Sequence, residues 1–171
     1  MRLMRRTLVA LALAVPVAGC GSGGGNSASG TRSGGSRLSA HDFAALAKES
    51  ALIDSWNHAV HKWSFAYKSG VRSRFLQVEG HYTDQMQLAS LHIRIGADAI
   101  DNIKLRSLQR QLGDAYRQQL RAIVAANTAV INKDQKAGQR AIAQLQVAAD
   151  HKLRVIERLA AAFPEVGKVA P

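Results

Sequence analysis

The feature that most restricts the fold of this chain is a long stretch that contains no proline. Residues 38–163 hold no proline and only five glycines, and Pro164 follows directly. Proline breaks helix interiors and is kept out of central strands, so such a stretch is typical of several long helices. The composition also favours helices over sheets, because aromatic residues make up only 5% of the chain while alanine, leucine and arginine are abundant.

Apolar residues within this stretch recur in steps of three, four and seven, which places them on one face of a helix. The connections "KSGVRS" and "KDQKAGQ" are short and hydrophilic, so the helices that they join are expected to be antiparallel. We therefore predict an all-α, up-down-up-down four-helix bundle, with a three-helix or open hairpin arrangement as the alternative. The spacing predicts helices at about residues 40–69, 72–97, 103–135 and 139–163.

Local signals indicate where some of these helices begin and end. Ser39 with Asp42 three residues later resembles a capping box at the start of the first helix. Gly70 can end that helix as a residue with left-handed backbone. The connection before the third helix is less well marked, and either Asp98 or Asp101 could cap that helix.

The N-terminus has the pattern of an export signal. "MRLMRRT" carries three arginines, and the apolar segment "LVALALAVPVA" that follows is shorter than the ~20 residues needed to cross a bilayer. Small residues then lead to Cys20, the only cysteine, so no disulfide can form within the chain. The segment "VAGC", which ends at Cys20, resembles the lipobox of bacterial lipoproteins. The resemblance covers residues 1–20 only, and no family is recognised for the remainder.

The lipobox resemblance implies a covalent lipid anchor. The chain would be cut between Gly19 and Cys20, and Cys20 would carry a diacylglycerol on its sulfur. Two or more acyl chains give lasting attachment, at about 0.8 kcal/mol per buried CH₂. The resemblance places the protein on the extracytoplasmic face of a membrane. Gly21, where an Asp would signal inner-membrane retention, favours the outer membrane in a diderm host. The alternative is an ordinary secretory signal with an incidental cysteine.

The segment after Cys20 predicts a flexible tether. Residues 21–37 include seven glycines and five serines and cannot bury apolar area. A coil of this length reaches roughly 20–25 Å. The chain is thus predicted to comprise a cleaved signal peptide (1–19), a lipidated cysteine with its tether (20–37), a helical bundle (38–163) and a C-terminal tail (164–171).

Positive charge is the strongest indication of a partner. The net charge is +11, and loss of the three signal-peptide arginines would leave 20 basic against 12 acidic residues. An arginine ridge on the third helix is expected to face solvent, interrupted by Asp114. It could contact anionic lipid, an envelope polymer or an envelope protein, or be only a solvated face. Nucleic acid is not expected, because no aromatic residues interleave and the chain is exported. The ridge consists of Arg106, Arg110, Arg117 and Arg121.

One exposed cluster is a candidate metal site. Asp54, His58 and His61 are spaced i, i+4, i+7 on the face of the first helix away from the apolar stripe. They could bind Zn²⁺ or Cu²⁺ weakly, although an exterior cluster lacks the buried supporting groups of an established metal site. The alternative is a hydrated face. No Glu-x-x-His pair, haem motif, nucleophile elbow or phosphate-binding loop occurs. We therefore expect no enzyme activity and no cofactor besides the lipid.

Two polar residues are expected within the apolar seams. Glu49 lies between Leu46 and Ile53, and Asn127 lies near the stripe of the third helix. Such residues could fix the register of the helices or line a ligand site. The sequence as a whole indicates a lipid-anchored envelope protein with a helical binding or structural module. A metal- or small-ligand-binding bundle is the second interpretation, and an uncharacterised enzyme is the third.

Overall fold

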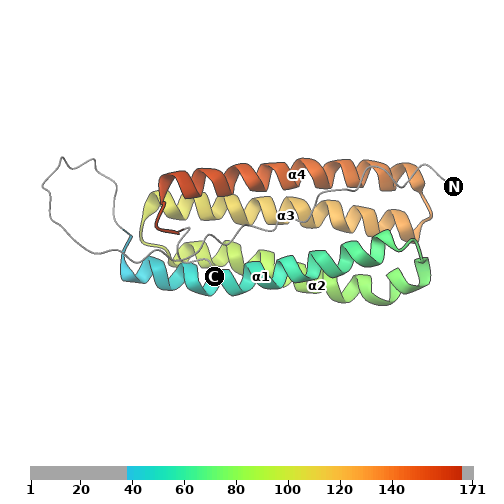
Figure 1. Cartoon of the computed structure of the whole chain (residues 1–171), viewed down its shortest axis with the longest axis horizontal. Helices are drawn as coiled ribbons and strands as arrows, with labels where there is room; N and C mark the ends of the chain where they lie inside the picture. Colours follow the sequence, from blue (N-terminus) through green and yellow to red (C-terminus); the bar gives the residue numbers. More distant parts are fainter. Residues whose placement is uncertain (1–37, 167–171) are drawn as a thin grey trace, which may run out of the picture. The chain divides into compact units, whose positions relative to one another are not determined.

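The computed structural model describes residues 38–166, and these residues form four long helices without any strand (Figure 1). Successive helices run in opposite directions, as the ribbon shows. The predicted all-α, up-down-up-down four-helix bundle is therefore confirmed. Cys20, the predicted signal peptide and the tether lie outside the described residues. The elements are α1 (Ala40–Lys68), α2 (Arg72–Gly96), the 3₁₀ helix η1 (Ala97–Ala99), α3 (Ile103–Ile131) and α4 (Gln135–Ala162).

Helices that are neighbours in sequence are also the closest neighbours in space. The backbones of α1 and α2, of α2 and α3, and of α3 and α4 pack closely, whereas α1 and α4 are not among these pairs. Side chains of all four helices nevertheless meet in one apolar core, which includes Trp56, Met86, Ile123 and Val155. A second apolar cluster, around Ile100 and Phe163, closes the end where α1 begins and α4 ends.

The predicted capping box of α1 is confirmed. The Ser39 hydroxyl accepts a hydrogen bond from the Asp42 N–H at 3.0 Å, and the Asp42 carboxylate accepts one from the Ser39 N–H at 3.1 Å. The other oxygen of Asp42 accepts from the N–H groups of Asp101 and Asn102 at 2.8 and 3.3 Å. Burial alone would raise the pKa of Asp42, but these hydrogen bonds lower it below its usual value. Asp42 thus joins the start of α1 to the connection before α3.

The cap of α3 differs from the sequence prediction. Asn102, not Asp98 or Asp101, accepts a hydrogen bond from the Leu105 N–H, at 3.0 Å. Both aspartates instead pair with side chains: Asp98 with Arg110 at 2.7 Å, and Asp101 with His41 at 3.1 Å. The reason is the intervening 3₁₀ turn, which places Asn102 immediately before the first helical residue, where a side chain can reach back to the exposed N–H groups.

The connection between α3 and α4 also lies earlier than predicted. The turn occupies residues 132–134, with Lys133 in left-handed backbone (φ 56°) and Asp134 capping α4 through the Ala137 N–H at 2.9 Å. Gly138, which the sequence placed in the connection, is a buried residue of α4. An added Cβ there would lie 3.7 Å from Ala129 of α3 and from the Tyr67 hydroxyl of α1. These are ordinary contact distances, so Gly138 is a buried position within α4 and does not form the turn.

At the same end of the bundle, Arg72 completes the C-terminus of α3. Its guanidinium donates hydrogen bonds to the Val130 and Ile131 carbonyls at 3.3 and 3.0 Å. The last carbonyls of a helix have no partner within the helix, so a cation there satisfies them. Across residues 38–166, none of the helices combines the length and apolar character required to cross a bilayer.

Candidate functional site

The close approach of α2 and α3 positions the predicted arginine ridge. A Cβ added to Gly113 of α3 would lie 2.9 Å from the Arg94 Cα of α2, so the two backbones nearly touch there. One ion pair joins Arg94 of α2 to Asp114 of α3 at 3.8 Å, and a second joins Arg110 of α3 to Asp98 of η1 at 2.7 Å. The ridge on α3 consequently lies beside the outer face of α2.

The four arginines of the ridge have different surroundings. Arg106 is half-buried, and its Nε donates to the Ile100 carbonyl at 2.6 Å. Arg110 donates from Nε and Nη2 to one oxygen of Asp98. The side chains of Arg117 and Arg121 make no hydrogen bond or ion pair with any other residue between 38 and 166. These last two arginines are therefore available to an external anion.

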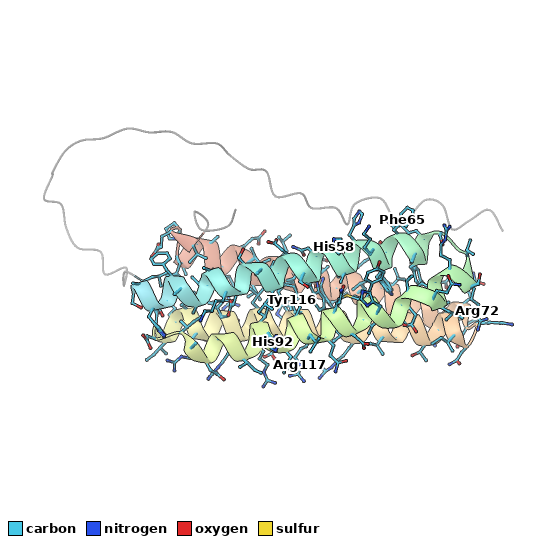
Figure 2. All side chains as sticks on the ribbon, turned by 90° about the horizontal axis from the view of Figure 1, so that it is seen from below. His58, Phe65, Arg72, His92, Tyr116 and Arg117 are labelled. Carbon is cyan, nitrogen blue, oxygen red and sulfur yellow. The ribbon has the colours of Figure 1, made fainter. Side chains whose placement is uncertain are left out.

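An apolar stripe on α2 adjoins the ridge. Leu88, Leu91 and Ile95 are 57%, 47% and 55% exposed and are spaced i, i+3, i+7, which aligns them on one face of the helix. We call the exposed surface formed by these three residues together with Arg94 and the ridge the α2–α3 face. In Figure 2, Arg117 and His92 lie toward one edge of the bundle, and His58 and Phe65 lie toward the opposite edge.

The sequence interpretation missed this stripe, although a signal for it was present. Apolar residues alternate in the segment "LHIRI", residues 91–95. On a helix, alternating residues point to different sides, so Leu91, Ile93 and Ile95 cannot all face the core. The structure buries Ile93 completely and leaves Leu91 and Ile95 exposed.

The histidine cluster on α1 does not gather into a site. Asp54, His58 and His61 are all exposed. Within the described part of the chain, no group of three His, Cys, Asp or Glu side chains is arranged so that it could hold a metal ion.

Asn127 is the centre of a buried hydrogen-bond network. It is 5% exposed, and its Oδ1 accepts from the Trp63 indole N–H at 2.8 Å. Its Nδ2 donates to the Glu79 carboxylate at 2.7 Å and to the Thr83 hydroxyl at 2.9 Å. These contacts join α1, α2 and α3 and fix their relative positions, which is a structural role.

Glu49 is equally buried but has no such network. It is 2% exposed, and neither carboxyl oxygen has a hydrogen-bond partner among residues 38–166. Burial raises the pKa of this carboxyl to about 7. An added Cβ at Gly96 would lie 2.8 Å from Glu49 Oε1, so the glycine makes room for the carboxyl group.

A contact between two ionisable side chains, the half-buried Lys152 and the buried Tyr116, was not found from the sequence. The Lys152 ammonium lies 4.9 Å from the centre of the Tyr116 ring, and that ring meets Trp56 edge-on at 4.9 Å between ring centres. Burial lowers the pKa of Lys152 to about 8 and raises the pKa of Tyr116, the latter with help from the charges of Glu49 and Asp54. Only the packing of three helices brings these side chains together, so spacing along one helix could not reveal them.

Comparisons with protein-family models, curated proteins and solved structures found no match for the chain. The function is therefore argued from the α2–α3 face itself.

Proposed function

We propose that this protein is a lipid-anchored envelope lipoprotein whose helical bundle binds the anionic surface of the membrane through the α2–α3 face. One observation carries the proposal: the side chains of Arg117 and Arg121 on α3 have no partner among the described residues, and α2, which packs against α3, exposes Leu88, Leu91 and Ile95. Cations bordering an apolar stripe are the features by which helices bind at the boundary between lipid headgroups and acyl chains.

The free energy expected for membrane binding by the α2–α3 face is small, and a tether to the membrane would compensate for it. A Lys or Arg near an anionic leaflet contributes about 1 kcal/mol, and burying apolar surface contributes about 25 cal/mol per Å². Two arginines and three aliphatic side chains give only modest affinity on their own. A lipid on Cys20 with a tether of roughly 20–25 Å would hold the bundle at a high local concentration near the headgroups. Weak binding by the α2–α3 face is then sufficient to keep the bundle in contact with the membrane.

The apolar stripe favours lipid over an envelope polymer as the partner. An anionic polymer in water offers charge to the arginines but nothing that shields Leu88, Leu91 and Ile95 from water. A bilayer offers both, because its acyl region begins directly beneath the charged headgroups.

The test is binding to vesicles by the mature chain, from residue 20, with Cys20→Ser so that no acyl chain contributes. We expect binding to vesicles that contain anionic lipid and loss of most binding in Arg117→Glu with Arg121→Glu. The matched control is Lys48→Glu with Lys62→Glu, which makes the same change in net charge at exposed positions of α1, a helix that does not pack closely against α3. Equal loss in both double variants would mean that net charge, and not this face, drives binding.

A further inference from the structure

A groove that is open to solvent follows the boundary between α3 and α4, which run side by side (Figure 1). Its volume is about 410 Å³, and sites for small ligands typically measure roughly 300–1,000 Å³. Such sites combine apolar walls with a few polar groups that orient the ligand. The groove has this composition, since its lining includes Gln118, Arg121 and Ala122 of α3 and Ala143, Val147 and Ala148 of α4.

The apolar part of the groove belongs mainly to α4. Ala122 and Ala148 are buried, and their small side chains leave room for a ligand between the helices. Val147 is 66% exposed, so an apolar chain lying in the groove would remove its methyl groups from water. Removal of apolar surface from water is favourable. The α4 side of the groove therefore suits the apolar part of a ligand.

The polar part of the groove belongs to α3. The exposed Arg121 side chain has no partner among residues 38–166, and Gln118 lies three residues earlier on the same side of the helix. Oε1 of Gln118 lies 2.9 Å from Nδ1 of His151, which leaves the amide N–H groups of Gln118 for a ligand. The α3 side thus offers hydrogen-bond donors and one positive charge to an anionic group. A guanidinium matches the oxygens of a phosphate especially well.

Arg121 belongs both to this groove and to the α2–α3 face. α2 and α4 each pack against α3, so the outer surface of α3 has the apolar stripe of α2 on one side and the groove on the other. A bundle that meets the membrane through the α2–α3 face therefore brings the groove to the level of the lipid headgroups. The amphiphilic anion available there is a phospholipid with an anionic headgroup.

We propose that the groove between α3 and α4 binds one anionic phospholipid molecule, with its phosphate on Arg121 and Gln118 and the first part of an acyl chain over Val147. The proposal rests on the proposed membrane contact for the source of the lipid. It goes beyond that contact, because a groove that takes one molecule forms a one-to-one complex, whereas a charged surface responds only to the total charge of the bilayer.

The experiment is a titration of the mature chain, from residue 20 with Cys20→Ser, with dihexanoylphosphatidylglycerol below the concentration at which it forms micelles. The amide signals of residues 118–122 and 143–148, followed by NMR, should shift saturably with half-saturation at roughly 1 mM. Glycerol phosphate has no acyl chains, and dihexanoylphosphatidylcholine has the same chains but no net charge. Each should bind at least about five-fold more weakly, because it lacks one of the two features that the groove recognises.

Two variants at exposed positions test the two parts of the groove. Arg121→Gln should weaken binding of the anionic lipid at least about five-fold, because it removes the charge from the hydrogen bonds to the phosphate. Arg74→Gln, the same change at an exposed position of α2 outside the groove, should leave binding unchanged. Ala143→Phe fills the groove without altering charge and should weaken binding as strongly, whereas Ala51→Phe on the exposed side of α1 should not.

The proposal is overturned if the signals of residues 118–122 and 143–148 do not shift saturably up to about 10 mM lipid, a limit that corresponds to very weak affinity. It is also overturned if Arg121→Gln or Ala143→Phe binds the lipid as the unchanged protein does, or if glycerol phosphate or the phosphatidylcholine binds as tightly. Failure of the groove alone would leave the vesicle binding of the Arg117 and Arg121 double variant altered as proposed above. Failure of the membrane contact would instead leave vesicle binding insensitive to that double substitution.

Discussion

The indole nitrogen of Trp63 lies 2.8 Å from Oδ1 of Asn127 and donates a buried hydrogen bond that joins α1 to α3 across the core. Asn127 in turn donates to Glu79 and Thr83 of α2. One amide side chain therefore holds three of the four helices in register. Glu49, the other polar residue predicted within an apolar seam, is not a member of this network and has no hydrogen-bond partner among residues 38–166.

Replacing Asn127 by alanine should lower the free energy of unfolding by about 2–4 kcal/mol, because it leaves the Trp63 donor buried without a partner and opens a small cavity. Chemical denaturation of the folded chain measures the effect. Asn57, an exposed residue of α1, is the matched control, and Asn57→Ala should change stability by less than about 0.5 kcal/mol. Similar effects in both variants would contradict the network.

Two glycines of the helix interiors should respond oppositely to the same substitution. Gly80→Ala should stabilise the protein by about 0.5–1 kcal/mol, because nothing lies within 4 Å of the added Cβ and alanine favours the helix. Gly113→Ala should destabilise it by about 1–3 kcal/mol, since the Cβ would lie 2.9 Å from the Arg94 backbone. Thermal unfolding measures whether each substitution raises or lowers the stability of the protein. Stabilisation by both substitutions would show that α2 and α3 are not in close contact.

Much of this fold follows from the sequence alone, because the spacing of apolar residues and the lack of proline determine where long helices form. The first two helices begin and end within one residue of the predicted bounds. The prediction for the third connection was wrong because Gly138 was taken for a turn residue. Gly138 is instead buried within α4, facing Ala129 and Tyr67 of other helices, and a local pattern cannot show on which side of a helix start a glycine falls.

The candidate surfaces were predictable only in part. Arginine spacing placed the ridge on the solvent side of the third helix. The adjoining stripe on α2 and the differing environments of the four arginines depend on how α2 and α3 pack. Likewise, the position of Glu49 in an apolar seam indicated burial, but a small cavity beside it is also lined by Gly96 and His92 of a second helix.

Glu49 should make the stability of the protein depend on pH. Because burial raises the pKa of its carboxyl from 4.5 to about 7, the folded state holds the proton more tightly than the unfolded state. The contribution of Glu49 to the free energy of unfolding should therefore be largest below about pH 4.5. It should fall by up to about 3 kcal/mol as the pH rises to about 7.

The measurement is the difference in stability between the unchanged protein and Glu49→Gln across this pH range. The difference removes the pH-dependent contributions that the two proteins share. We expect Glu49→Gln to be more stable above pH 7 and the advantage to shrink toward pH 5. A difference that does not vary with pH would mean that the carboxyl is not held in an environment that disfavours its charge.

Cys20→Ser in the full-length chain should abolish lipid attachment and any retention in the membrane fraction that survives washing with high salt. Serine offers no thiol for the diacylglycerol, and the weak, charge-dependent contact of the α2–α3 face should be released by salt. Metabolic labelling with palmitate and fractionation of salt-washed membranes measure both effects. If the serine variant were still cleaved after Gly19 and resisted the salt wash, the lipobox interpretation would be wrong.

The most direct test of the central claim is to measure which side of the bundle enters the membrane. Because Cys20 is the only cysteine, the mature chain with Cys20→Ser can carry one environment-sensitive fluorophore on Leu91→Cys, in the α2–α3 face. The matched control is Phe65→Cys, at a position on α1 that is 68% exposed and lies toward the edge of the bundle opposite Arg117 in Figure 2. On vesicles with anionic lipid, we predict a blue shift for the label at 91 and little change at 65. Equal shifts at both positions, or a larger shift at 65, would contradict the proposed orientation.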